Sequence, residues 1–189
     1  MGRWEPNASG RLRRAAMELY VERGFEQTTV AEIAERAGLT ARTFFRYFAD
    51  KREVLFAGSA SLQEALVAAL EGAPDDASPM EAVAAALDAA AAFLGEGREL
   101  SRQRQAVIGA NAELRERELI KMATLSAALA AGLRRRGVTD PDASLAAEAG
   151  VVIFRVAFER WVTDSRAREL SEIMRESLGQ LRALTAASK

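Results

Sequence analysis

The sequence predicts an all-α protein, and three observations lead to this class. The 189 residues are rich in Ala, Leu, Glu and Arg and include only 4 Pro, a composition that favours helices because these side chains lose little freedom there. Apolar residues recur at helical spacing along most of the chain. Several segments begin with a Ser, Thr or Asp that is followed three residues later by Glu, as in a capping box.

The first two expected elements are helices joined by a loop. The first covers residues 9–23, and Gly24 follows at a position where helices often end in a left-handed residue. The second opens at Thr29, which forms a capping-box pattern with Glu32, and it stops at Gly38. Both helices are therefore bounded by residues that favour helix ends.

A third helix turns this region into a helix-turn-helix. It is expected over residues 41–48, with Thr40 as its N-cap, so that two short helices flank a turn that carries a glycine. Phe44 and Phe48 fall on its inward face, opposite Ile33 of the preceding helix. Its outward face carries Ala41, Arg42, Thr43, Phe45, Arg46 and Tyr47.

The remainder is expected to form a larger helical domain. A fourth helix is expected from Asp50 through Leu70, and residues 72–79 form a linker-like stretch with two Pro, two Asp and a Gly. We place the domain boundary after residue 53, which gives domains of residues 1–53 and 54–189. The other expected helices cover residues 78–93, residues 98–136 with a kink near 109–111, residues 143–164 and residues 166–186.

The absence of two residue types excludes several kinds of chemistry. With 0 Cys and 0 His, the chain can form no disulfide, no Cys-ligated zinc site and no Ser-His-Asp triad. Inward-facing acidic pairs at helical spacing, which a carboxylate-bound metal would need, are not found in the apolar stretches. We therefore expect no catalytic residues, no metal and no cofactor.

The sequence also predicts a protein without a membrane span. Its longest uncharged stretch, Met122 to Leu133, is shorter than the ~20 apolar residues that a spanning helix needs. The N-terminus has no apolar run of the kind found in a secretory signal. A cytoplasmic location is the expectation.

The outward face of the third helix has the chemistry of a DNA reader. The net charge of −1 decides nothing by itself, because the distribution of charge matters more. Arg42 can donate two hydrogen bonds to a guanine edge, and Thr43 can contact a base or a thymine methyl. Lys51, at the next helix start, is expected to meet a phosphate. The residues expected to bind DNA are Thr29, Thr40, Arg42, Thr43, Phe45, Arg46, Tyr47 and Lys51.

Residues 9–56 resemble the N-terminal domain of TetR-family regulators. The resemblance rests on the first helix ending in Gly24-Phe25, on TTVAEIAERAGLT at residues 28–40 and on FFRYFADK at residues 44–51. It implies three DNA-reading helices and a larger helical domain that binds a small molecule and dimerises. Phe45 departs from the family pattern, because a phosphate-contacting tyrosine is frequent there.

The resemblance further implies a repressor that binds a near-palindromic DNA operator as a homodimer and is released by a small effector. An apolar pocket with a polar end is expected, and its candidate residues are Phe93, Arg104, Val107, Ile108, Asn111 and Phe154. Apolar faces on the last two helices favour a four-helix bundle with the partner. The candidate interface residues are Phe158, Trp161, Met174, Leu178 and Leu181.

Two alternatives stay open on the sequence. The helix-turn-helix could dock a protein instead of DNA, in which case changing Arg42 and Lys51 would leave DNA affinity unaltered. The chain could also regulate without an effector, because the small alanine side chains equally allow close helix packing with no pocket. The sequence indicates neither the operator nor the effector.

Overall fold

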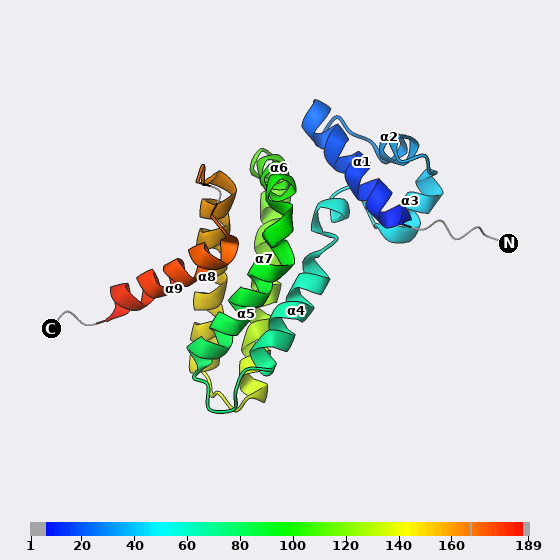
Figure 1. Cartoon of the computed structure of the whole chain (residues 1–189). Coiled ribbons are helices and arrows are strands. Elements are labelled where there is room, and N and C mark those ends of the chain that lie inside the picture. The colour runs from blue at the N-terminus through cyan, green and yellow to red at the C-terminus, as the bar shows by residue number, and fades with distance from the viewer. Residues whose placement is uncertain (1–6, 167, 187–189) are drawn as a thin grey trace. The chain divides into compact units, whose positions relative to one another are not determined.

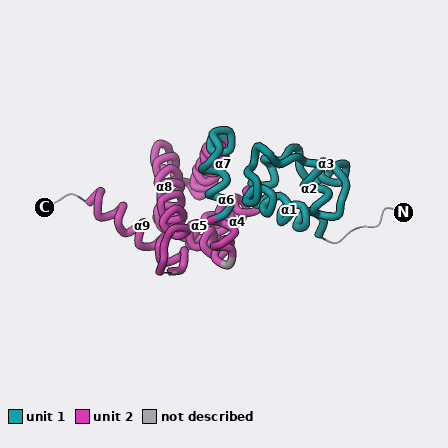
Figure 2. The backbone as a smooth tube through the Cα atoms, turned by 90° about the horizontal axis from the view of Figure 1, so that it is seen from above, with its two compact units in different colours: residues 1–58, 103–116 teal, residues 59–102, 117–189 magenta. Residues whose placement is uncertain are grey.

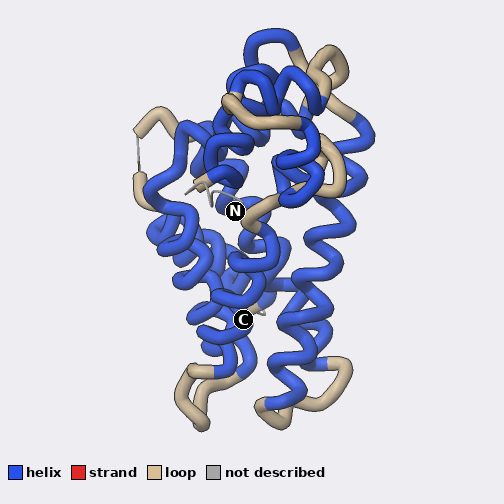
Figure 3. Tube along the Cα trace, turned by 90° about the vertical axis from the view of Figure 1, so that its right-hand side faces the viewer, coloured by secondary structure: helices blue, strands red, loops and turns tan. Residues whose placement is uncertain are grey.

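A computed structural model describes residues 7–166 and 168–186, with only the backbone of Glu96. Helices and loops account for all of these described residues, and no strand occurs among them (Figure 3). The expectation of an all-α protein is confirmed.

The helices follow one another in the order that Figure 1 labels. Two short 3-10 turns, η1 and η2, interrupt the series of α-helices. The elements are α1 (Ala8–Arg23), α2 (Val30–Arg36), α3 (Ala41–Tyr47), η1 (Glu53–Phe56), α4 (Ser59–Glu71), α5 (Pro79–Leu94), η2 (Gly95–Gly97), α6 (Arg98–Gly109), α7 (Ala112–Arg135), α8 (Asp142–Thr163) and α9 (Leu170–Thr185).

The chain forms two compact units (Figure 2). Unit 1 comprises Met1–Gly58 and Gln103–Glu116, and unit 2 comprises Ser59–Arg102 and Arg117–Lys189. The end of α6 and the start of α7 thus belong with the helix-turn-helix, whereas a single boundary after residue 53 was expected. The cause is apolar packing, because Ile108 lies in the core of unit 1.

The core of unit 1 is built from one face of each of its helices. Leu12 of α1, Ile33 of α2 and Phe44 of α3 are fully buried, and Phe48 is buried beside them. Each such side chain contributes about 1.5–3 kcal/mol by leaving water. The predicted inward faces of α2 and α3 are therefore confirmed.

Local signals set the ends of α2 as expected. The Glu32 backbone N–H donates to the Thr29 hydroxyl at 3.3 Å, and the Thr29 N–H donates to the Glu32 carboxylate at 2.9 Å, which completes a capping box. Gly38 follows α2 with a φ of +65°, a conformation that costs little only for glycine. The turn between α2 and α3 is thus encoded locally.

The expected fourth helix from Asp50 to Leu70 is not continuous. The Asp50 carboxylate accepts the N–H groups of Arg52 and Glu53 at 2.8 and 3.1 Å, but it caps only the short turn η1. The chain then turns at Gly58, a poor helix former, before α4 begins. Residues 53–71 are long and apolar enough for a membrane span by composition alone, yet they do not form one helix.

The core of unit 2 is rich in alanine on α5. Ala82, Ala86 and Ala90 are buried at helical spacing, so that neighbouring helices can approach closely. Gly150 of α8 is one such contact, because a Cβ at this position would lie 2.8 Å from a methyl group of Val83. Bulky side chains complete the core: Leu66, Leu70, Leu133, Phe154, Trp161 and Ile173.

Candidate nucleic-acid interface

The outward face of α3 is exposed, as the sequence predicts. Arg42 and Arg46 are exposed, and the side chains of Phe45 and Tyr47 are 58% and 40% exposed. Such exposure of large aromatic side chains leaves apolar surface in water unless a partner covers it. The buried Phe44 anchors this face from beneath.

Aromatic contacts order two of these exposed side chains. The ring of Phe45 packs edge-on against buried Phe44, with 5.6 Å between centroids. The Arg46 guanidinium lies 5.0 Å from the centre of the Tyr47 ring and donates to its hydroxyl at 3.3 Å. These contacts already restrict the rotamers of the two side chains, so less conformational entropy is lost when they bind a partner.

Two of the three threonines expected to bind DNA, Thr29 and Thr40, act as helix caps. The Thr40 hydroxyl accepts the N–H of Thr43 at 3.2 Å and lies 3.0 Å from the Thr43 hydroxyl. The Thr29 hydroxyl donates to Glu32 at 2.8 Å in addition to its role as N-cap. Both side chains therefore define where the helices of the helix-turn-helix begin.

Lys51 lies in a different environment from the expected one. Its ammonium group donates to the carbonyl oxygens of Phe25, Glu26 and Thr28 at 2.9, 3.3 and 3.0 Å. It also lies 4.3 Å from the centre of the Phe25 ring. An ammonium has three donors, and all of them point to the loop between α1 and α2.

Arg11 lies outside the set of residues expected to bind DNA, and it makes contacts that the sequence reasoning did not predict. Its Nε donates to the Ala37 carbonyl at 3.0 Å, and its Nη2 donates to the carbonyls of Ala37 and Gly38, the latter at 3.3 Å. A signal was available, because Arg11 lies three residues after Ala8 and four before Ala15, both buried. That spacing puts Arg11 on the inward side of α1.

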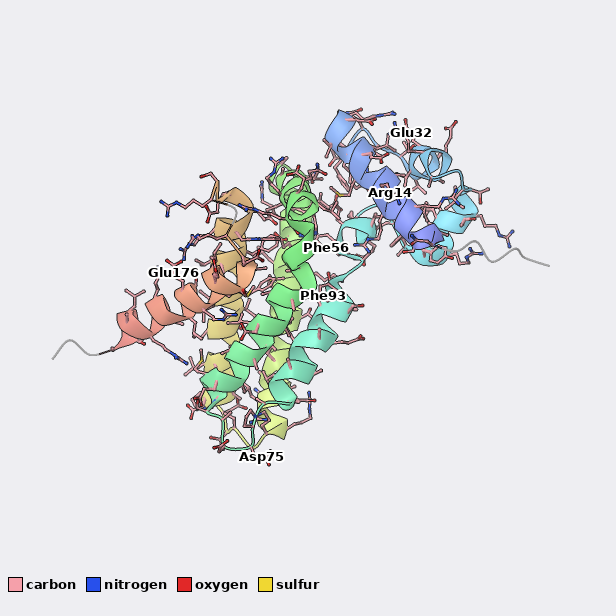
Figure 4. All side chains as sticks on the ribbon, in the orientation of Figure 1. Arg14, Glu32, Phe56, Asp75, Phe93 and Glu176 are labelled. Carbon is pink, nitrogen blue, oxygen red and sulfur yellow. The ribbon has the colours of Figure 1, made fainter. Side chains whose placement is uncertain are left out.

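The six predicted pocket residues are divided between the two units. Val107 and Ile108 are buried in the core of unit 1, which corrects their expected place in a cavity. Also in unit 1, Arg104 donates to the Leu55 carbonyl at 2.7 Å, and Asn111 donates to Glu26 at 2.8 Å. The other two belong to unit 2: Phe93, half-exposed and labelled in Figure 4, and Phe154, buried in the core.

The predicted interface residues also need a correction. Trp161, Met174 and Leu178 are buried within unit 2, so they leave little surface for a partner. Phe158 and Leu181 are half-buried against the same core. The exposed apolar side chains of α8 are instead Leu145, Val152 and Val156.

Ion pairs tie the start of η1 to the start of α7 within unit 1. Arg52 pairs with Asp50 at 2.5 Å and also with Glu113. The hydrogen bond from Arg52 lowers the pKa of Asp50 below its usual range. Nearby, burial raises the pKa of Tyr20, whose hydroxyl donates to the Lys51 carbonyl at 2.6 Å.

No metal centre emerges from the acidic side chains of the described residues. No group of three or more Asp or Glu residues lies close enough together there to hold an ion. Several acidic residues around the helix-turn-helix pair with arginines instead, as Glu22 does with Arg36 at 2.9 Å.

Known proteins match both parts of the chain. Residues 12–57 match the model for bacterial regulatory proteins of the tetR family, and residues 77–186 match the MftR C-terminal domain. The HTH-type transcriptional regulator TcmR of Streptomyces glaucescens is 41% identical over 86 residues, which are 46% of this chain and 38% of TcmR. The chain thus matches well under half the length of this relative.

Solved structures match over nearly the whole chain. FadR of Thermus thermophilus, a TetR-family repressor solved in complex with lauroyl-CoA, is 26% identical with a TM-score of 0.59, and 96% of each chain is covered. A TetR-family regulator from Syntrophomonas wolfei shares the fold, with a TM-score of 0.69, 16% identity and 94% of each chain covered. With a helix-turn-helix that matches the N-terminal model and a helical unit that matches the C-terminal one, the chain belongs to the TetR family of bacterial regulatory proteins.

Proposed function

We propose that the protein is a transcriptional repressor that reads a near-palindromic DNA operator through α3. The observation that carries this proposal is the outward face of α3, where Arg42, Phe45, Arg46 and Tyr47 are all exposed on a helix anchored by a buried phenylalanine. A short helix with donors and flat apolar groups suits the major groove. Thr43 belongs to the same reading face, and Thr29 and Thr40 mark the helix starts where backbone contacts are made.

We propose that operator binding requires a homodimer. A helix-turn-helix dimer reads half-sites ~34–36 Å apart or multiples of that distance. Leu145, Val152 and Val156 are exposed on α8, and with Ala149 between them they form one stripe at helical spacing. This stripe supports an interface in which α8 packs on the partner's α8, with α9 alongside it.

The proposed effector is an acyl-CoA or another molecule with a long apolar chain, bound in unit 2. FadR of Thermus thermophilus was solved with lauroyl-CoA and is similar over nearly its whole length, which supports this class. Leu62, Met122 and Phe158 are half-buried apolar side chains that pack against the core of unit 2, and mostly apolar side chains are what such a ligand needs. A protein with this function acts in the cytoplasm, where DNA and acyl-CoA are both present.

The proposal is tested by selecting bound sequences from a random duplex pool. The enriched duplex is then used in fluorescence anisotropy at several salt concentrations, with lauroyl-CoA and with free CoA as its control. A near-palindromic duplex that lauroyl-CoA releases and CoA does not is the expected result. Enrichment of no sequence would overturn operator recognition, and release by neither compound would overturn the acyl-CoA assignment alone.

A further inference from the structure

We infer that Arg11 and Lys51 are positioning residues of the helix-turn-helix, which hold backbone carbonyls at the two ends of α2, and that neither contacts DNA phosphates. The inference rests on the proposed function, because it assigns roles within the same DNA-reading unit. Both are cations of unit 1: Arg11 lies on α1, and Lys51 lies in the segment between α3 and η1. In sequence alone, each has the appearance of a phosphate ligand.

Lys51 is fully engaged before any DNA arrives. Its three carbonyl acceptors, from Phe25, Glu26 and Thr28, lie between 2.9 and 3.3 Å from Nζ. Its ammonium also faces the Phe25 ring, which adds a cation–π attraction. A phosphate contact would require Lys51 to give up one of these hydrogen bonds, so the net gain in binding free energy would be small.

The backbone of Lys51 is held as firmly as its side chain. The buried Tyr20 of α1 donates its hydroxyl to the Lys51 carbonyl at 2.6 Å. Tyr20 also packs edge-on against Phe25, with 5.3 Å between ring centroids. The end of α1, the loop before α2 and the segment after α3 therefore meet at one point.

Arg11 performs the equivalent task at the other end of α2. Its guanidinium donates to the carbonyls of Ala37 and Gly38, the two residues that follow the last turn of α2. Unsatisfied carbonyls at a helix C-terminus attract cations. The planar guanidinium can serve both acceptors at once.

These two contacts set the direction of α3. Arg11 fixes the turn that leads into α3, and Lys51 fixes the segment that leaves it, while both are anchored on or near α1. The exposed Arg42 and Arg46 of α3 remain available for DNA. A change at Arg11 or Lys51 should therefore reduce operator recognition and leave general attraction to DNA intact.

The test compares the full-length variants Arg11→Met and Lys51→Met with Arg13→Met, which removes the same charge from an exposed position of α1. The probes are the enriched duplex and a scrambled duplex of equal length, at a temperature where circular dichroism shows each variant folded. For both variants we expect operator affinity to fall about tenfold. Affinity for the scrambled duplex and the salt slope should match those of Arg13→Met.

Two results would overturn the inference. A salt slope smaller by ~0.9 than that of Arg13→Met, with equal losses of affinity for both duplexes, would identify a phosphate contact. Lowered thermal stability with unchanged affinity for both duplexes would show a purely structural role. If Lys51→Met does not fold, Lys51→Arg replaces it, because a guanidinium keeps the charge but cannot direct its donors to the same three carbonyls.

A second readout needs no DNA and so separates this inference from the proposed function. A Cβ at Gly38 would lie 2.8 Å from Nη2 of Arg11, so the effects of Gly38→Ala and Arg11→Ala on unfolding should be coupled. Lys51→Met should accelerate amide exchange at Thr28, whose N–H donates to the Phe25 carbonyl, but not in α8. Additive effects, or unchanged exchange, would remove the corresponding residue from the assignment even if no duplex is enriched.

Discussion

At the scale of single residues, the arginines of the helix-turn-helix differ in what they already contact. Arg11 serves the turn, Arg36 pairs with Glu22 at 2.9 Å, and Arg46 lies over the ring of Tyr47. Arg42 is exposed at the start of α3, the end of a recognition helix that contacts base edges. We therefore expect base readout to depend most on Arg42.

Replacing Arg42 with alanine should weaken operator binding by ~1–3 kcal/mol and relax specificity at one base position. The reason is the loss of a bidentate contact to one guanine edge. Anisotropy on the enriched duplex and on its single-base variants measures this. Arg134→Ala, a control in unit 2 that removes an exposed ion pair with Asp140, should bind all duplexes as the unaltered protein does.

At the scale of elements, hydroxyl caps decide where the short helices begin. Thr29, Thr40 and Ser78 each accept a backbone N–H from the residue three positions later. A seven-residue helix such as α2 has few internal hydrogen bonds, so each cap satisfies a large share of its free donors. Asp50 shows that a cap alone does not determine helix length. Its carboxylate accepts the N–H groups of Arg52 and Glu53, but only the four-residue turn η1 follows.

Thr29→Ala should lower the free energy of unfolding by about 1 kcal/mol, through loss of the capping box. Urea titration followed by circular dichroism gives this value. Thr124→Ala is the matched control, since Thr124 is exposed within α7 and its hydroxyl bonds only to the Ile120 carbonyl. A loss at Thr124 equal to that at Thr29 would contradict the capping argument.

At the scale of the whole molecule, residues 103–116 complete the DNA-reading unit. Ile108 is fully buried there, so Ile108→Ala should lower the free energy of unfolding by ~2–5 kcal/mol. Ile120→Ala, at a position 57% exposed, should change it by no more than ~0.5 kcal/mol. Equal losses for the two variants in urea titrations would show that Ile108 does not belong to the core.

The dimer proposal makes a separate prediction. The double variant Val152→Glu, Val156→Glu should be monomeric in light scattering after gel filtration, because charges would then face each other across an apolar interface. The operator affinity of this variant should also fall, since a monomer reads only one half-site at a time. Leu119→Glu, at a site 59% exposed on α7, is the control and should remain a dimer.

Stability should fall in acid and vary little near neutral pH. The pKa of Asp50 is lowered by its hydrogen bond from Arg52, that of Asp164 by the Arg166 N–H, and that of Glu176 by Arg160. As the pH falls, the carboxylates of the unfolded chain bind protons before those of the folded protein do. The contribution of these carboxylates to the free energy of unfolding is therefore present above about pH 4 and is lost as pH falls through the lowered pKa values.

Urea titrations between pH 2.5 and pH 8 measure this dependence. Asp50→Asn should flatten the acid limb, because it removes one carboxylate whose pKa is lowered. With 0 His in the chain, a steep change between pH 6 and pH 8 would contradict the assignment.

Much of the fold could be predicted because it depends on neighbours in sequence. The box of Thr29 and Glu32, the turn at Gly38 and the inward faces of Phe44 and Phe48 all follow from spacings of four residues or fewer. Such features are determined by backbone geometry and side-chain type. The class, the helix-turn-helix and the exposed face of α3 could therefore be predicted from the sequence alone.

The contacts of certain side chains depend on the tertiary structure and could not be predicted from local spacing. Arg11 and Lys51 reach carbonyls 23 to 27 residues away, and Arg104 reaches Leu55 across 49. Apolar spacing likewise cannot tell whether Ile108 or Trp161 meets its own core, a ligand or a partner, since all three remove the same surface from water. Which surface lies opposite depends on how helices distant in sequence pack together, and that information is absent from local periodicity.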